Sequence, residues 1–211
     1  MSDRKKTQER FLADVRDHAI QIIRDDGVYR HVRFKRPNSN CMGFELITWP
    51  GMLCYTGDMG TYVFSRLNDM FNFFRMPQDQ LFDIDFRYWA EKVEGQDKWD
   101  GLREWDEDSF KKEIRRQKGR LALAWHKKLK EDQFEDLMRE LDDVVNSSDE
   151  IEAVQRVRDF HFTYWDDQGE MRSIYLDTDD FPSCKKYSYR FTWCCHALAW
   201  GIAQYDAQRP A

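Results

Sequence analysis

The first third of the chain is built from short runs in which apolar and polar residues alternate. Four such runs, rich in β-branched and aromatic residues, are Val28–Lys35, Gly43–Trp49, Met52–Thr56 and Thr61–Ser65. A period of two is typical of a strand with one buried face. Pro50-Gly51, Gly57 and Gly60 lie between the runs and favour tight turns. The pattern therefore predicts an antiparallel meander of three or four strands.

Helical spacing is expected on both sides of this meander. Between Thr7 and Asp25 the apolar residues Phe11, Val15, Ile20, Ile22 and Ile23 recur at roughly helical spacing, and Gly27 follows as a stop signal. After the meander, Leu67, Met70, Phe71 and Phe74 take the same spacing up to Pro77. We expect a first helix over 7–25 and a second that ends before Pro77.

Beyond Pro77 the spacing is mainly helical. Helices are predicted over Phe82–Lys92, Ser109–Lys130, Gln133–Val145 and Asp149–Phe160. The runs His161–Trp165 and Met171–Leu176 flank Asp166-Asp167-Gln168-Gly169 and favour a hairpin, with an extended helix as the alternative. From about Tyr187 to Tyr205, aromatic and small residues form one face of a helix that should be buried.

These elements define an α+β fold: an N-terminal helix and a small antiparallel β-meander, followed by a mainly α-helical half with a buried C-terminal helix. No Pro, Gly or Ser tract divides the 211 residues. We therefore expect a single domain over 1–211, with a β-containing lobe over about 1–76 and a helical lobe over about 77–211.

The composition of the chain indicates the cellular compartment and the kinds of partner to expect. The chain carries a net charge of −6 and five cysteines, and 15% of its residues are aromatic. An acidic total argues against coating nucleic acid through a global positive field. The odd cysteine number favours free thiols in a reducing cytoplasm, and no segment is apolar over the roughly 20 residues needed to cross a membrane. We expect a cytoplasmic protein with no membrane partner.

Catalytic and cofactor motifs are absent from the sequence. There is no phosphate-binding glycine loop, no His-Glu-x-x-His and no Cys-x-x-Cys. Cys194, Cys195 and His196 are adjacent on a predicted helix, so their side chains diverge and are better explained as core residues than as a nucleophile with its base. We expect no metal and no cofactor, and a non-enzymatic role is favoured over catalysis.

One aromatic pocket is the leading candidate for ligand binding. If the C-terminal helix packs across the sheet, residues from the turns and from that helix could meet: Trp49, Asp58, Tyr62, Arg66 and Arg190. Trp49 and Tyr62 would stack on a ligand, Asp58 would accept a hydrogen bond, and the two arginines would contact an anion. Ordinary core aromatics are the competing explanation.

Two further chemistries stay open. The predicted helix over 111–130 is strongly basic and is the best candidate for nucleic-acid contacts, through Lys111, Lys112, Arg115, Arg116, Lys118 and Arg120. The acidic helix that follows could instead neutralise these charges. Scattered carboxylates, Asp83, Asp85, Asp177, Asp179 and Asp180, could bind Mg²⁺ for hydrolysis if folding brought them together; solvated loops and helix caps are the competing explanation.

Two stretches carry a resemblance to a known group of proteins. They are Phe44–Arg66, FELITWPGMLCYTGDMGTYVFSR, and Tyr189–Asp206, YRFTWCCHALAWGIAQYD. Both resemble a family of small uncharacterised proteins encoded by tailed phages and prophages, over about a quarter of the chain and with no catalytic motif. The resemblance implies a phage accessory protein acting by binding in the bacterial host cytoplasm, with counter-defence as one role. It would sequester a host protein or a small nucleotide-like ligand; the alternative is a nucleic-acid-binding or nucleic-acid-processing protein using the basic helix.

Overall fold

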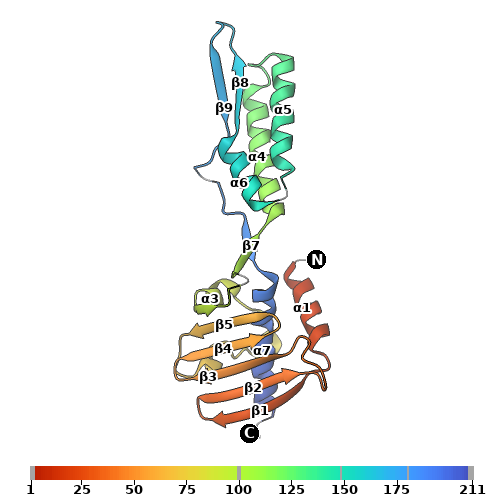
Figure 1. The fold of residues 1–211 in the computed structure, drawn as a ribbon, viewed down its shortest axis with the longest axis vertical. Coiled ribbons are helices and arrows are strands. Elements are labelled where there is room, and N and C mark those ends of the chain that lie inside the picture. The colour runs from red at the N-terminus through yellow and green to blue at the C-terminus, as the bar shows by residue number, and fades with distance from the viewer. Residues whose placement is uncertain (1–2, 99–100, 148, 180, 209–211) are drawn as a thin grey trace. The chain divides into compact units, whose positions relative to one another are not determined.

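The computed structural model describes residues 3–98, 101–147, 149–179 and 181–208. Two compact units make up the chain (Figure 1): the sheet unit, residues 1–104 and 187–211, and the helical unit, residues 105–186. The α+β class is confirmed, with an N-terminal helix and an antiparallel sheet followed by helices and a C-terminal helix. The units divide at 104/105 and 186/187, whereas the expected lobes met at residue 77.

The sheet unit is organised around six antiparallel strands in the order β1-β2-β3-β4-β5-β6. Their bounds are β1 Ala19–Asp26, β2 Tyr29–Lys35, β3 Phe44–Trp49, β4 Met52–Gly57, β5 Gly60–Ser65 and β6 Val93–Gln96. The four predicted runs became β2 to β5, and β1 and β6 extend the meander beyond the three or four strands expected. Neighbouring strands follow one another in sequence. Short turns connect β1 to β2, β3 to β4 and β4 to β5, a longer loop connects β2 to β3, and residues 66–92 separate β5 from β6.

The prediction of one helix over 7–25 is wrong in its second half. Helix α1 spans Asp3–Val15, and Ala19–Asp26 is strand β1. The residues Ile20, Ile22 and Ile23 have near-helical spacing, but they are β-branched and pair with β2 instead. The amide of His18 donates to the carbonyl of Val15 at 2.9 Å, which closes a turn between the two elements.

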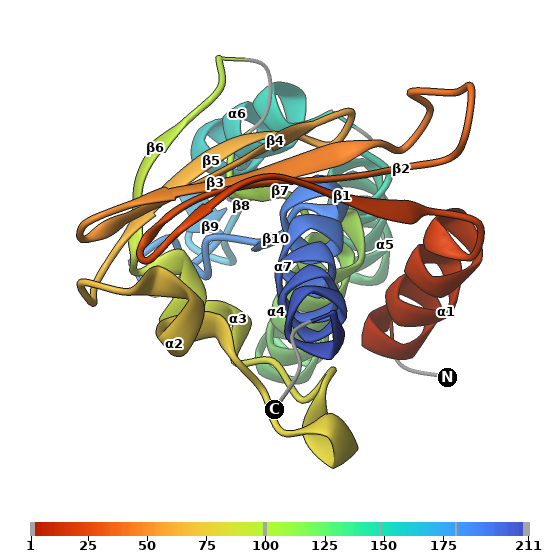
Figure 2. The same cartoon turned by 90° about the horizontal axis from the view of Figure 1, so that it is seen from below.

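All helices of the sheet unit lie on one side of the sheet (Figure 2). They are α1, α2 Met70–Phe74, α3 Phe86–Ala90 and α7 Tyr189–Ala207, with a short 3-10 turn, η1 Gln78–Gln80, between α2 and α3. Helix α7 is buried as expected, with eleven buried residues. Its Gly201 lies against Phe34 and Leu46 of the sheet so closely that a Cβ would meet their side chains at 3.2 Å.

A buried ion pair joins this helical layer to the sheet. Arg30 of β2 is 6% exposed and donates from its two terminal nitrogens to Asp69, at 2.8 and 2.9 Å. Asp69 is also the N-cap of α2, accepting from the amide of Phe71 at 3.0 Å. Arg30 Nε donates to the Tyr205 hydroxyl of α7, which donates to Asp25 at 2.6 Å. Because the groups share partners, one network positions α2 and the end of α7 on the sheet.

The described residues of the helical unit form three helices and a hairpin with a core of their own. The helices are α4 Glu107–Trp125, α5 Glu131–Val145 and α6 Glu150–Asp159, and the strands are β8 His161–Trp165 and β9 Met171–Tyr175. The predicted hairpin is confirmed, since β8 and β9 pair antiparallel. β7 Arg103–Trp105 and β10 Lys185–Tyr187 contain the two points where the chain passes between the units, and they form a two-stranded sheet. Within the described residues no helix is long and apolar enough to cross a membrane.

Candidate functional site

The candidate site lies on the side of the sheet opposite the helices, called here the outer face. Along each strand, alternate side chains point to opposite faces. The inward residues are buried, for instance Leu46, Tyr55 and Phe64 at 0% exposure. The intervening residues of β2 to β5 point outward and are half-buried or, at the strand ends, exposed. Figure 2 shows the helices α1, α2, α3 and α7 on the other side of the sheet.

Five outward residues on the central strands form one apolar surface, called here the outer patch. Ile47, Cys54 and Val63 are directly opposite one another on β3, β4 and β5, and Trp49 and Met52 pair in the next outward row. Trp49 is 37% exposed. Burial raises the pKa of Cys54, so its sulfur is a neutral thiol at neutral pH and adds to the apolar surface. Outward positions of an antiparallel sheet with one solvated face are normally polar, which makes this patch unusual.

A charged network borders the outer patch on β2 and β3. Arg33 Nε donates to Glu45 at 2.7 Å, and His31 bonds the other oxygen of the same carboxylate. Burial alone would raise the pKa of Glu45, but the hydrogen bonds from His31 and Arg33 outweigh it and hold the pKa below its usual value. The carboxylate is therefore ionised and largely neutralised by its partners.

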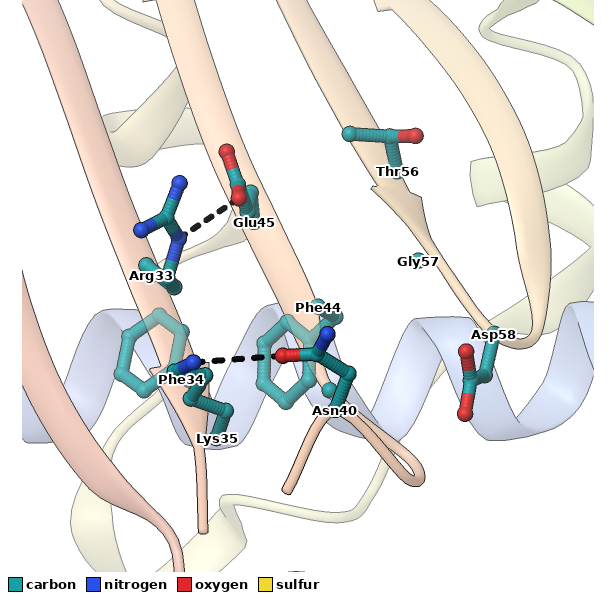
Figure 3. A pocket seen from close by; sticks show the side chains of 10 residues that line it. Arg33, Phe34, Lys35, Asn40, Phe44, Glu45, Thr56, Gly57 and Asp58 are labelled. Atoms are coloured by element: carbon teal, nitrogen blue, oxygen red, sulfur yellow. Dashed lines mark hydrogen bonds and ion pairs between the residues drawn. The ribbon is translucent and has the colours of Figure 1, made fainter. Parts of the chain in front are cut away.

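Beyond this network the outer face is hollowed into a polar recess of about 490 Å³ (Figure 3). It is lined by Arg33, Phe34, Lys35, Asn40, Gly43, Phe44, Glu45, Thr56, Gly57 and Asp58. The rings of Phe34 and Phe44 are at most 1% exposed, so the recess offers no aromatic surface. A ligand there would meet mainly charged and hydrogen-bonding groups.

Hydrogen bonds hold the loop that forms one wall of this recess. Asp58 accepts from the amide of Met42 at 2.7 Å, and Lys35 Nζ donates to Asn40 at 3.1 Å. Asn38 and Met42 have φ values of 62° and 57°, a left-handed conformation that residues other than glycine adopt at a cost. The loop is thus fixed in an unfavourable backbone geometry by its neighbours, as is common beside binding sites.

The five residues expected in one aromatic pocket are not brought together. Tyr62 points inward and is 1% exposed, with its ring 5.6 Å from that of Phe191. Trp49 and Asp58 are both on the outer face but at opposite ends, because Trp49 pairs with Met52 and Asp58 follows Gly57. At about 3.3 Å per residue, the ends of β4 are roughly 17 Å apart.

The two arginines of the expected pocket are on different elements and are not brought together at one site with Trp49 and Asp58. Arg66 is exposed and follows β5 at the Trp49 end of the sheet. Arg190 is exposed in the first turn of α7, the helix on the opposite side of the sheet from the outer face. Trp49 therefore belongs to the outer patch and Asp58 to the recess, where Arg33 and Lys35 take the place expected for Arg66 and Arg190.

Most cations of the basic helix, now α4, are paired with carboxylates. Lys111 pairs with Glu107, Arg116 with Glu113, Lys118 with Asp142 of α5 and Arg120 with Asp177. The other two expected contacts, Lys112 and Arg115, are exposed on the same helix. The helical unit holds 21 of the 39 acidic and 15 of the 33 basic residues, so it carries the whole net charge of −6. This balance weakens the case for nucleic-acid binding.

The thiol and carboxylate candidates have structural roles or remain dispersed. Cys194, Cys195 and His196 are at most 1% exposed, and burial raises the pKa of both thiols well above the usual value, which disfavours a reactive thiolate. Asp85 is the N-cap of α3. Among the described residues no group of three or more His, Cys, Asp or Glu side chains could hold a metal ion. Asp180 lies outside the described residues.

Sequence reasoning missed the outer patch and most of the recess. The signal was present, since Ile47 and Trp49 are apolar at positions where the alternation of β3 calls for polar side chains. The recess had no such signal, because the loop before β3 and the β4–β5 turn meet only in the folded sheet. Comparison of the chain with protein-family models, with curated proteins and with solved structures found no match.

Proposed function

We propose that the protein acts by binding a partner protein through the outer patch. The observation that carries this proposal is the row Ile47, Cys54 and Val63 with the neighbouring pair Trp49 and Met52, all outward on central strands. A continuous apolar surface of this kind on a soluble fold is typical of an interaction site. Tryptophan and methionine are also enriched where protein interfaces are fully buried.

Charge favours a protein over a nucleic acid as the partner. The sheet unit contains 18 acidic and 18 basic residues, so it has no net field to attract phosphates. Arg33, which borders the outer patch, is already paired with Glu45. The expected partner is therefore a protein whose contact area is apolar and aromatic rather than strongly charged.

The wider role proposed here rests on the sequence resemblance. In a phage-infected cell the partner would be a host protein in the bacterial cytoplasm, and sequestering it would be a counter-defence function. A nucleotide-like ligand is less well supported, because the exposed Trp49 and the cations of the recess are at opposite ends of the sheet. One bound nucleotide could not stack on the ring and place its phosphates in the recess.

A single charge introduced into the outer patch tests the proposal. Ile47→Lys places an ammonium at its centre, and Gln21→Lys places the same group on the outer face of edge strand β1, outside the patch. Two-dimensional NMR spectra first establish that both variants are folded. Partners are selected from a library of bacterial proteins with the wild type, purified and titrated against all three forms.

We expect at least one purified protein to bind the wild type and Gln21→Lys alike, and Ile47→Lys at least about tenfold more weakly. Loss of one buried apolar side chain with introduction of a charge readily costs the 1.4 kcal/mol that this factor represents. If every partner binds Ile47→Lys as tightly as the wild type, the outer patch is not the contact surface and the proposal fails.

A further inference from the structure

The polar recess separates its charges across its width. Arg33 and Lys35 come from β2 on one side, and Asp58 comes from the β4–β5 turn on the other (Figure 3). Strands β2 and β4 are two spacings apart, about 10 Å, because β3 runs between them. The recess is therefore dipolar, with its cations and its free carboxylate facing one another over a gap.

A glycine lies immediately before the strand between them and leaves room in the middle of the recess. Gly43 precedes β3, and a Cβ there would lie 3.4 Å from the Cβ of Lys35 and 2.9 Å from the carbonyl oxygen of Asn40. Glycine adds no side chain to the middle of the recess, where Asn40 lies between Lys35 and Asp58 and accepts from Lys35 Nζ (Figure 3). Gly57 is equally constrained, since a Cβ would lie 2.4 Å from the Gly43 carbonyl oxygen.

Each charged group that lines the recess keeps further hydrogen-bonding capacity. Lys35 Nζ has three N–H donors and uses one on Asn40. Arg33 uses Nε on Glu45 and keeps its two terminal nitrogens as further donors. Asp58 accepts from Met42 through Oδ2 and retains Oδ1. Glu45, the remaining carboxylate, is already shared by Arg33 and His31.

We propose that this recess binds a small zwitterionic ligand whose ammonium and carboxylate groups are several bonds apart, such as a dipeptide or an ω-amino acid. The ligand carboxylate meets Lys35 and Arg33, and its ammonium meets Asp58. The separation across β3 excludes a free α-amino acid, whose charged groups are too close together to reach both sides. A volume of about 490 Å³ is within the range of small-molecule sites. The site is independent of the outer patch.

The test is a titration of the protein with 6-aminohexanoate and alanyl-alanine, followed through the backbone amide signals of Gly43 and Gly57. Hexanoate and hexylamine each supply one charge of the zwitterion, and alanine supplies both charges too close together. Lys35→Gln removes a cation but keeps a side chain that can reach Asn40. Asp58→Asn removes the negative charge and keeps an oxygen to accept from the Met42 amide. Arg24→Gln, outside the recess on β1, is the matched control.

We expect both separated zwitterions to saturate the signals and the three other probes to bind at least about tenfold more weakly, because each lost charge-assisted hydrogen bond is worth roughly that factor. Lys35→Gln and Asp58→Asn should each weaken 6-aminohexanoate to the same extent, and Arg24→Gln should leave it unchanged. The proposal is overturned if no probe saturates, if hexanoate matches 6-aminohexanoate, or if Asp58→Asn binds as the wild type does. Ile47→Lys should retain this binding, so failure here and failure of the outer patch are distinguishable.

Discussion

Replacing His196 should change how the stability of the sheet unit depends on pH. His196 lies on α7 and is 1% exposed, with the rings of Phe11, Phe82 and Phe86 centred 5.9, 5.4 and 5.6 Å away. Neither ring nitrogen has a hydrogen-bond partner among the described residues. Burial lowers the pKa of this histidine from 6.5 to about 4. The folded protein therefore holds the neutral imidazole in an apolar setting.

The direction of the pH effect on stability depends on whether the folded or the unfolded chain binds the proton at the higher pH. Below pH 6.5 the unfolded chain protonates His196, whereas the folded chain does so only near pH 4. Acidification through this window thus favours unfolding, and stability is lost from pH 6.5 downward. The full difference between the two pKa values of His196 corresponds to about 3 kcal/mol in the free energy of unfolding, of which about 2 kcal/mol is lost by pH 5.

His196→Leu removes the titrating group while keeping an apolar side chain of similar size. At pH 7.5 we expect the variant to be as stable as the wild type or up to about 1 kcal/mol more stable, because two unsatisfied ring nitrogens are gone. At pH 5.0 its advantage should grow by about 2 kcal/mol. Burial also lowers the pKa of His18, but both proteins contain that residue, so the comparison cancels its effect.

Urea denaturation at pH 7.5 and 5.0 measures these differences. The transition is followed through the NMR signals of β3 and β4, which report on the sheet unit. His126→Gln, at an exposed position just after α4, controls for loss of a histidine from the chain. If His196→Leu loses as much stability as the wild type between the two pH values, His196 accepts its proton in the folded state and the argument from burial is refuted.

Three other perturbations test the structure. Asp69→Ala removes the nearer of the two carboxylates beside the buried Arg30 and should cost about 2 to 3 kcal/mol in urea denaturation, whereas Asp206→Ala, at the exposed pair with Arg75, should cost less than about 1 kcal/mol. Gly57→Ala places a Cβ 2.4 Å from a backbone oxygen and should lower the melting temperature clearly, while Gly119→Ala meets nothing within 4 Å and should leave it unchanged or higher. Binding to a fluorescent 20-nucleotide DNA, measured by anisotropy, should be undetectable at physiological salt because most of α4's cations are paired; tight binding that weakens steeply with salt would restore the nucleic-acid alternative.

Local patterns in the sequence determined most of the elements. Strands β2 to β5, helix α5, the hairpin β8–β9 and the buried helix α7 are all indicated by alternation or helical spacing within a few residues of each position. Turn residues such as Pro50-Gly51 set where these elements end. The reason is that backbone propensity and a one-sided apolar pattern act over short stretches of chain.

Only the tertiary structure decided which partners those elements take. Ile20–Ile23 became a strand because β2 offered an open edge, which outweighed near-helical spacing. Tyr62 became a core residue and Trp49 a surface residue because α7, more than a hundred positions later, covers one face of the sheet and leaves the other open. The recess depends on Lys35, Gly43 and Asp58 meeting across three strands. Such contacts join residues far apart in the chain, so no local pattern encodes them.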